Sequence, residues 1–291
     1  MTGPWRSGRY EGLLFVGPFL FVYSFLLIYP LFNGIVLSFH RADLFGGGRF
    51  VGLDNYARLF ADPIFHQSLL NTFKLALIIV PTLTIISLAL ALALNKPTRG
   101  AALFRGLFFS SSVLSVTIVT LIWRFILTPD AGLLAEVLEA LGREPIPFLS
   151  HPSLTIPALA ITTIWWSVGL PMMLFLAGLQ QIPEDMYEAA ALDRAGRWTT
   201  FRRITLPSLK RTTILVVMLQ TAAQLQIFGQ AQLLTAGGPS GASRPVVLYI
   251  YEVSFGRWEL GYATALAEVL FMLIIAVTLV QYWAGQRGQE R

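Results

Sequence analysis

The 291-residue chain contains no cysteine, and only 13% of its residues are charged. The absence of cysteine excludes disulfides, thiolate metal sites and a cysteine nucleophile. Soluble domains carry roughly 25% charged residues, so this deficit, with 55% apolar residues, indicates a membrane protein. The net charge of +5 does not indicate nucleic-acid binding, because the basic residues are scattered between apolar blocks and form no continuous face.

Sequence patterns typical of active sites are also missing. The chain has no G-x-x-x-x-G-K-[S/T] segment, so it lacks the loop that cradles nucleotide phosphates. Its three histidines, His40, His66 and His151, fit the spacing of no metal site and are expected as solvated side chains in or near outer loops. We therefore expect a chain that is not an enzyme and that binds no metal ion or cofactor itself.

Long apolar segments dominate what is present. A helix needs roughly 20 apolar residues to cross the hydrocarbon core, and backbone groups in lipid must bond within their own segment. The alternating strands of a membrane barrel are not seen. The sequence therefore predicts an all-α membrane protein with six transmembrane helices. Their expected ranges are 13–39, 70–94, 105–127, 154–179, 211–234 and 262–284.

The first apolar segment has an alternative interpretation as a signal peptide. It is too long for the apolar region of such a peptide, and no convincing small-residue cleavage site follows it. We expect a retained helix with Trp5 and Tyr10 near one membrane interface.

The distribution of lysine and arginine predicts the orientation, because cytoplasmic segments carry an excess of both. With the N-terminus inside, 13 of the 21 basic residues fall on the inner side. These are Arg6, Arg9, Lys96, Arg99, Arg105, Arg194, Arg197, Arg202, Arg203, Lys210, Arg211, Arg287 and Arg291. The acidic residues Asp130, Glu136, Glu139 and Glu144 share one outer loop. Both termini are therefore expected in the cytoplasm.

The domain organisation is expected to be simple, since no stretch has the composition of a flexible linker. A cytoplasmic N-terminus over 1–11 precedes one membrane domain over 12–285, and a cytoplasmic tail follows over 286–291. Outer loops are expected near 41–68, 128–153 and 235–260.

A polar segment over 183–207 interrupts two of the apolar segments. Pro183 suits the start of a short helix, and Glu184 and Asp185 then lie where the helix dipole favours negative charge. Met186, Ala189, Ala190 and Asp193 share one side of this helix, where small alanines allow another surface to approach. Gly196 is expected to end it in a left-handed conformation. A second helix over 198–204 is expected to stop before Leu206 and Pro207. The alternative is an ordinary amphipathic loop.

The sequence motif in this segment resembles that of a known family. Glu188-Ala189-Ala190 is followed by thirteen residues and then by Ile204-Thr205-Leu206-Pro207, which resembles the EAA loop of bacterial ABC importer permeases, in the carbohydrate-uptake branch of the maltose and glycerol-phosphate type. Other resembling segments are 50–56 with Asn71-Thr72, 122–124 with 129–134, 174–179, 234–239 and 261–265.

The resemblance implies a type I importer permease fold whose cytoplasmic EAA loop docks onto an ATPase. It implies as partners a second homologous permease subunit, two ATPase subunits that bind ATP and magnesium, an extracytoplasmic solute-binding protein, a sugar substrate and the lipid bilayer of the bacterial inner membrane. The residues that it assigns to coupling are Glu188, Ala189, Ala190, Asp193, Arg194, Gly196, Leu206 and Pro207.

One position departs from the family pattern. Arg194 occupies the place where the family has glycine, within Asp193-Arg194-Ala195-Gly196. Either the turn needs no positive φ at this position, or Gly196 supplies it two residues later. In both cases we expect docking to remain intact, and the arginine has the charge to pair with an acidic residue of the ATPase.

Polar side chains within the apolar segments are candidates for substrate contacts. Gln220 and Gln224 share a helix face, and their amides match sugar hydroxyls because each donates and accepts. Trp165 and Trp166 suit stacking on a pyranose ring. The alternatives are that the glutamines bridge helices of the permease pair and that the tryptophans pack or lie at an interface.

Glu268 is a carboxylate about two turns into the last apolar segment. It either lines a substrate cavity or forms a structural ion pair with Arg124 or Lys74. It is also the only intramembrane acid that we find, whereas an ion-coupled secondary carrier, the main alternative class, needs several at matched positions. Within the importer class, the alternative substrate is glycerol-3-phosphate or another polyol. No cationic cluster lies in the apolar segments, which favours a neutral sugar.

Overall fold

The computed structural model describes residues 8–43 and 48–287, with side chains over 15–43 and 48–286. Trp5, Arg6 and Arg291 lie outside the described residues, and Arg9, Tyr10 and Arg287 outside the described side chains. Apart from one two-stranded sheet, the regular structure there is helical. The elements are α1 (Gly8–Tyr23), η1 (Ser24–Ile28), α2 (Tyr29–Ser38), β1 (His40–Arg41), β2 (Arg49–Phe50), α3 (Asp54–Ala61), α4 (Pro63–Leu94), α5 (Arg99–Ser111), α6 (Val116–Leu127), α7 (Leu133–Ala140), α8 (Thr155–Ser167), α9 (Gly169–Gln180), α10 (Glu184–Leu192), α11 (Arg197–Thr200), η2 (Phe201–Thr205), α12 (Leu206–Ser208), α13 (Lys210–Leu225), α14 (Gly229–Leu234), α15 (Val246–Tyr251), η3 (Glu252–Gly256) and α16 (Leu260–Arg287).

Three continuous helical segments of the described chain are long and apolar enough to cross a membrane. They are Phe15–Ser38, Pro63–Leu94 and Leu260–Gln286. The first includes the π-helical turn η1, where the helix hydrogen bonds shift by one residue without ending the helix. These segments fall on the first, second and sixth expected spans, and the second begins seven residues before the expected 70.

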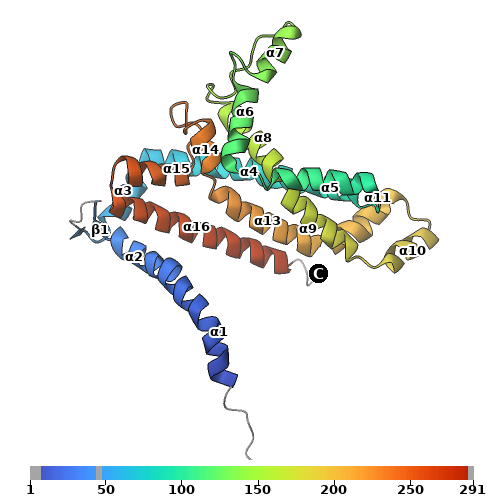
Figure 1. Ribbon diagram of the computed structural model, residues 1–291, viewed down its shortest axis with the longest axis horizontal. Helices are drawn as coiled ribbons and strands as arrows, with labels where there is room; N and C mark the ends of the chain where they lie inside the picture. The colour runs from blue at the N-terminus through green and yellow to red at the C-terminus, as the bar shows by residue number, and fades with distance from the viewer. Residues whose placement is uncertain (1–7, 44–47, 288–291) are drawn as a thin grey trace, which may run out of the picture. The chain divides into compact units, whose positions relative to one another are not determined.

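Two pairs of shorter apolar helices reach the length of a span only when each pair is counted together. Helices α5 and α6 meet at an angle of 96°, and α8 and α9 meet at 48°. Counting each bent pair as one span gives five candidate spans. Figure 1 shows α6 turning sharply away from the line of α5. The fifth expected span, 211–234, is divided between the 16-residue helix α13 and the short helix α14, so this segment does not reach the length of a continuous span.

The described chain divides into two compact units. The first contains residues up to Asp62 together with Ile250–Phe271, and the second contains Pro63–Tyr249 with the segment that begins at Met272. In the second unit the 32-residue helix α4 is central, because α8, α9 and α13 all pack against it. Figure 1 shows α5, α9 and α13 running alongside one another in this unit.

The core of the second unit forms along α4. Leu75, Ile79 and Leu83 are fully buried against residues of α8, α14 and α15. Further along the same helix, Ala91 packs with Met172 and Phe175 of α9 and with Val216 of α13. The helix is apolar around most of its circumference, as expected for a membrane helix enclosed by neighbours.

Asn71 and Thr72 of α4 anchor a distant loop. The Asn71 side-chain amide donates to the carbonyls of Gly241 and Arg244 at 2.9 and 3.1 Å, and the Thr72 hydroxyl accepts from the Val246 amide at 3.0 Å. These bonds satisfy loop backbone groups that would otherwise be buried without partners, so they fix the start of α15 against α4.

Candidate functional site

The polar segment between α9 and α13 folds as a compact helical loop. Pro183 immediately precedes α10, and Glu184 and Asp185 occupy its first turn, as expected. Residues 181–183 connect α9 to α10 along the chain.

Helix α10 ends in a Schellman motif centred on Arg194. The Ala195 amide donates to the Ala190 carbonyl at 2.9 Å, and the Arg194 amide donates to the Ala191 carbonyl at 3.0 Å. Arg194 itself has a φ of +54°, the conformation in which glycine is usual. Both expectations for this turn are therefore wrong: the turn does need a positive φ here, and Gly196 does not provide it.

Gly196 has a different role from the expected one. Its φ of −67° and ψ of 157° are extended, and it precedes α11 as the N-cap residue. The Schellman motif needs its left-handed residue directly after the C-cap residue Asp193, so Gly196 comes two residues too late.

The second helix of the loop does not stop before Pro207, contrary to expectation. Leu206 is helical, with φ of −64° and ψ of −44°, and α12 contains Pro207 in its first turn. The π-helical turn η2 lies immediately before it, and the Leu206 amide donates to the Phe201 carbonyl five residues back. Proline cannot donate a backbone hydrogen bond, and this shift in the bonding pattern lets the helical path continue through it.

One side of the loop is held by contacts within the loop. Ala190 is buried, and the hydroxyl groups of Tyr187 and Thr205 are hydrogen-bonded at 3.2 Å, which ties α10 to η2. Ala190 therefore packs within this chain, whereas Glu188 and Ala189 are exposed. The sequence pattern had placed both alanines on one accessible side.

Large apolar side chains are exposed on this polar loop. Leu192 is 86% exposed and Trp198 is 70% exposed, and Met186 and Leu206 are each 41% exposed. Asp193, Arg194, Gly196 and Pro207 are exposed as well. Exposed apolar side chains rimmed by charged residues are typical of a surface that another protein covers.

The break between α5 and α6 is bonded to the bend between α8 and α9. The hydroxyl groups of Ser111 and Ser112 donate to the Trp166 carbonyl at 3.3 and 3.1 Å. In return, the Trp166 indole N–H donates to the Leu114 carbonyl at 3.1 Å. Side chains thus satisfy the backbone groups that each break releases. These bonds hold Trp166 at the bend, and its contact with a sugar stays a prediction.

Trp165 lies beside a tryptophan that the sequence analysis did not single out. The rings of Trp165 and Trp123 are arranged edge to face with centroids 6.0 Å apart. Trp165 is 42% exposed, whereas the buried indole nitrogen of Trp123 has no hydrogen-bond partner among the described residues. A donor of this kind next to an exposed ring is suited to a polar ligand.

Two glycines let the broken helices approach closely. A Cβ atom added to Gly169 would lie 2.5 Å from the Phe108 carbonyl oxygen of α5. One added to Gly229 would lie 2.9 Å from a methyl group of Val116, at the start of α6. The helix ends at these breaks thus approach so closely that neither Gly169 nor Gly229 has room for a Cβ atom without movement of its neighbours.

Gln220 and Gln224 are both buried on α13, and the Gln224 amide lies 3.5 Å from the Gln220 amide oxygen. Their shared face is the one that the sequence predicts. No hydrogen bond among the described residues joins this pair to Trp165 or Trp166. The two glutamines and the two tryptophans are therefore separate candidates for substrate contact.

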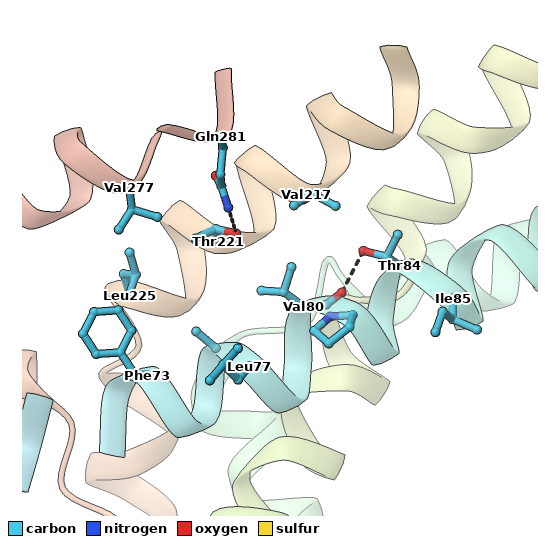
Figure 2. Close-up of a pocket in the computed structure, with 12 residues that line it drawn as sticks. Phe73, Leu77, Val80, Thr84, Ile85, Val217, Thr221, Leu225, Val277 and Gln281 are labelled. Atoms are coloured by element: carbon cyan, nitrogen blue, oxygen red, sulfur yellow. Dashed lines mark hydrogen bonds between the residues drawn. The ribbon is translucent and has the colours of Figure 1, made fainter. Parts of the chain in front are cut away.

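An apolar cavity of about 590 Å³ lies between α4, α13 and α16 (Figure 2). Phe73 and Leu77 line it from α4, Leu225 from α13 and Val277 from α16. Figure 2 shows two hydrogen bonds among the lining residues: the Gln281 amide donates to the Thr221 hydroxyl at 2.8 Å, and the Thr84 hydroxyl donates to the Val80 carbonyl at 2.7 Å. The lining resembles that of a lipid-facing groove more than that of a sugar site.

Glu268 belongs to the first unit and lies opposite Gly34 of α2. A Cβ atom added to Gly34 would lie 3.5 Å from a carboxylate oxygen of Glu268. The acid forms no ion pair with the described residues of its own unit. Within the described residues, no group of three or more acidic residues and histidines is arranged to hold a metal ion.

The sequence analysis did not predict the two helix breaks or the position of Trp123. For the breaks, local residue patterns could have predicted them. The run Ser110-Ser111-Ser112 with Ser115, an N-cap of α6, marks a break that the apolar count passed over. Gly169 and Pro171 mark the bend in the next span in the same way. Trp123 carries no such signal, because an apolar tryptophan in a membrane helix has no distinguishing pattern.

Several apolar helices of membrane-spanning length, joined by an exposed polar loop, are typical of a polytopic membrane protein. The sequence profile of the family described as "Binding-protein-dependent transport system inner membrane component" matches residues 84–288. The chain belongs to this family, and it is therefore a multi-pass protein of the inner membrane.

Several curated relatives match the chain over nearly its full length. It is 33% identical to the probable ABC transporter permease protein YurN of Bacillus subtilis, covering 95% of this chain and 96% of that one. It is also 33% identical to the sulfoquinovosyl glycerol transport system permease protein SmoG of Agrobacterium fabrum, covering 94% and 89%. The lactose transport system permease protein LacF of Rhizobium radiobacter is 31% identical, with 95% and 94% covered.

The fold agrees with a solved transporter. A chain of a bacterial ABC transporter involved in the import of the acidic polysaccharide alginate superposes with a TM-score of 0.86, at 22% identity, covering 97% of this chain and 98% of that chain. The fold is therefore that of a type I ABC importer permease, as the resemblance implied.

Proposed function

We propose that this chain is one permease subunit of an ATP-driven, binding-protein-dependent importer for a sugar. The observation that carries the proposal is the loop over 183–207, where Leu192 and Trp198 are exposed between charged residues at the end of a membrane bundle. Relatives named as permeases for lactose, trehalose/maltose and multiple sugars support the substrate class. Because no cationic cluster lies in the apolar segments, a neutral sugar is favoured over glycerol-3-phosphate.

The proposed assembly has six spans with both termini in the cytoplasm. A second, homologous permease completes the pathway, and an extracytoplasmic solute-binding protein delivers the sugar. Two ATPase subunits bind ATP and magnesium below, since this chain has no phosphate-binding loop of its own. In this arrangement the fifth span consists of α13 and α14, and the sixth span is α16.

The proposed mechanism is alternating access. Closure of the ATPase pair on ATP moves α10, and the three-residue link moves α9 with it. Because α9 is separated from α8 by a bend, it can rotate as a rigid body and open the pathway to the opposite side. Glu188 is exposed on α10 and is the residue that we assign to coupling.

The test is ATP hydrolysis by the reconstituted complex in lipid nanodiscs, with Glu188→Ala and with Glu184→Ala as the matched control. Both residues are exposed acids of α10, but only Glu188 belongs to the motif. We expect hydrolysis stimulated by binding protein and sugar to fall about tenfold or more in Glu188→Ala and to change little in Glu184→Ala. Normal transport by Glu188→Ala, or a chain that purifies without any ATPase, would favour the ion-coupled carrier.

A further inference from the structure

Helix α13 and the part of α16 that belongs to the second unit meet at two levels. The Gln281 amide donates to the Thr221 hydroxyl at 2.8 Å, and Figure 2 shows Gln281 reaching from α16 toward α13. Nearer to the start of α13, a Cβ atom added to Gly285 would lie 3.0 Å from the Ile214 side chain. The space beside these two contacts is not filled by side chains of the second unit.

Two cavities lie end to end along α13. The apolar cavity of about 590 Å³ extends from Leu225 to Val217, and a second cavity of about 330 Å³ extends from Val217 to Lys210. Both are lined by Val217 and Gln281, so they form one groove. We call this space, between residues 210–225 of α13 and 277–285 of α16, the α13–α16 groove.

The wide end of the groove is open along a membrane-spanning helix. Leu77 and Ile85 of α4 line it and are 73% and 67% exposed, whereas Leu225 at its base is buried. Leu77 and Ile85 belong to the continuous apolar segment Pro63–Leu94. Lipid chains surround such a segment in the hydrocarbon core, so an apolar opening at this level suits an acyl chain.

The narrow end of the groove carries a positive charge. Lys210 lines it and forms no ion pair with the described residues, and no acidic residue lines either cavity. At the end of α16, Tyr282 and Trp283 are 48% and 63% exposed, as in the aromatic belts at membrane–water interfaces. This end therefore lies at the level of the lipid headgroups.

The length of the groove matches one leaflet of a bilayer. Helix α13 advances about 1.5 Å per residue, so Lys210 and Leu225 are about 22 Å apart along its axis. A leaflet with its headgroups is about 20–22 Å thick. A lipid whose phosphate lies at Lys210 would thus place the end of its chain near Leu225.

We infer that the α13–α16 groove binds one anionic phospholipid, with an acyl chain along the groove and the phosphate at Lys210. Basic pockets between membrane helices recognise anionic headgroups in this way. The lipid would fill the space beside two helices that meet at two levels, and it would hold the start of α13, which follows the loop over 183–207. The inference goes beyond the proposed function, and only the choice of the inner leaflet rests on the proposed orientation.

Two other occupants fit the groove less well. A sugar needs several polar groups, but the Gln281 amide and the Thr221 hydroxyl are already bonded to each other. A helix of the second permease would cover the apolar part without bringing a phosphate to Lys210. The test below separates this second case from a lipid.

The test is photo-crosslinking of the chain, with its co-purified subunits, in nanodiscs of phosphatidylcholine. The probe is phosphatidylglycerol with a diazirine in its acyl chain, present as a small fraction of the lipid. Mass spectrometry compares adducts on the groove residues Val217, Leu225 and Val277 with adducts on Leu103 and Leu107, which are exposed on α5 outside the groove. The same diazirine on phosphatidylcholine tests the headgroup.

The variants remove the charge or fill the groove, and each has a matched control. Lys210→Gln removes the lining cation, and Arg211→Gln removes the exposed neighbouring cation, which does not line the groove. Val277→Phe places a ring in the groove, and Val280→Phe places one at a 68% exposed position of the same helix outside it. Thermal midpoints show that the variants are folded, and Val277→Phe keeps the inference testable if Lys210→Gln is not.

We expect the ratio of groove adducts to reference adducts to fall about fivefold or more in Lys210→Gln, because one basic residue at the surface contributes about that factor to binding of an anionic lipid. Val277→Phe should lower the ratio by at least as much. The ratio in Arg211→Gln and Val280→Phe should stay within about twofold of the wild type. The phosphatidylcholine probe should give a ratio about fivefold lower in the wild type.

Equal ratios for the two lipids, or a ratio within about twofold of the wild type in Lys210→Gln, would overturn the inference. Adducts on Leu103 and Leu107 but none in the groove, with either lipid, would show that protein covers the groove and would also overturn it. None of these outcomes affects the proposed function, which is judged by sugar-stimulated ATP hydrolysis. Conversely, failure of that hydrolysis would leave the adduct ratios to be judged on their own.

Discussion

Arg194 is a charged residue in a backbone conformation that normally selects glycine. A left-handed conformation costs an L-residue with a Cβ atom about 1–2 kcal/mol, and Arg194 adopts it with a φ of +54° at the exposed end of α10. The Schellman hydrogen bonds of Ala195 and Arg194 hold the turn closed in spite of this cost. The turn is therefore preserved by its backbone bonds, and the side chain is presented outward.

Replacing Arg194 by glycine should stabilise the end of α10. Removal of the Cβ atom relieves the strain, and we expect amides 189–195 to exchange with deuterium about five- to thirtyfold more slowly if the full 1–2 kcal/mol is recovered locally. Hydrogen exchange of the reconstituted complex measures this directly. Arg194→Ala is the control, since it removes the charge but keeps the strain. Faster exchange in Arg194→Gly than in Arg194→Ala would contradict this account of the turn.

Single positions of the loop were predictable from the sequence to different degrees. The acidic first turn at Glu184 and Asp185 follows from the helix dipole and is confirmed. The left-handed residue was assigned to Gly196, because glycine is the usual choice and the competing backbone bonds at Arg194 leave no mark on the sequence. The direction of Ala190 into the loop depends on the Tyr187–Thr205 bond, which joins residues 18 positions apart.

At the scale of elements, the broken spans determine the shape of the second unit. The breaks at 112–115 and 168 are joined by hydrogen bonds of Ser111, Ser112 and Trp166, so the two bends support each other. Gly169 makes this possible, since its Cα lies where any side chain would meet the backbone of α5. Close approach is the reason for this glycine, as its φ is not positive.

Gly169→Ala should destabilise the bundle. The new methyl group would meet the Phe108 carbonyl oxygen at 2.5 Å and the Phe109 Cα at 2.7 Å, so α9 and α5 must separate. Overpacking of this kind costs about 1–3 kcal/mol, and we expect a lower thermal midpoint in detergent. Gly106→Ala is the matched control on α5, because a Cβ atom there meets nothing within 4 Å. That change should raise stability slightly, by about 0.5–1 kcal/mol. Equal midpoints for the two variants would rule out the close contact.

The existence of the helices was predictable, but their continuity was not. Apolar length identified 70–94 and 262–284 within about eight residues at each end, because a span of that size leaves a long run without charge. The same criterion joined α5 to α6 and α8 to α9, because a bend of 96° or 48° removes no apolar residue from the count. The positions of the two bends were indicated only by local residues, namely the serines before α6 and the segment Gly169-Leu170-Pro171.

At the scale of the whole molecule, the orientation decides whether the loop can meet an ATPase. Basic residues favour the side of Lys96, Arg105 and Arg203 as the cytoplasmic side. The chain is convenient for a direct test, because it has no cysteine and any introduced thiol is unique. Asn95, between α4 and α5, and Ser150, before α8, are both exposed.

A membrane-impermeant maleimide should label Ser150→Cys in intact spheroplasts and should label Asn95→Cys only after lysis. The reason is that the two positions lie on opposite sides of the membrane in the proposed arrangement. Labelling in denaturant provides the control that both thiols react when accessible. The reverse pattern would put the loop over 183–207 outside the cell, where it could dock onto no ATPase.

In the proposed mechanism, the bend at 168 lets α9 move as a rigid arm. Helix α9 has 12 residues, which at 1.5 Å per residue is about 18 Å of rigid arm between the bend at 168 and the loop. A rotation of about 10° at the bend would displace its far end by about 3 Å, without breaking a hydrogen bond inside the arm. Conversely, a movement of a few ångströms at α10 would correspond to a rotation of only a few degrees at the bend, beside Trp165 and Ser112. The position of the bend along the span thus sets how far the proposed docking loop moves for a given rotation at the centre of the membrane.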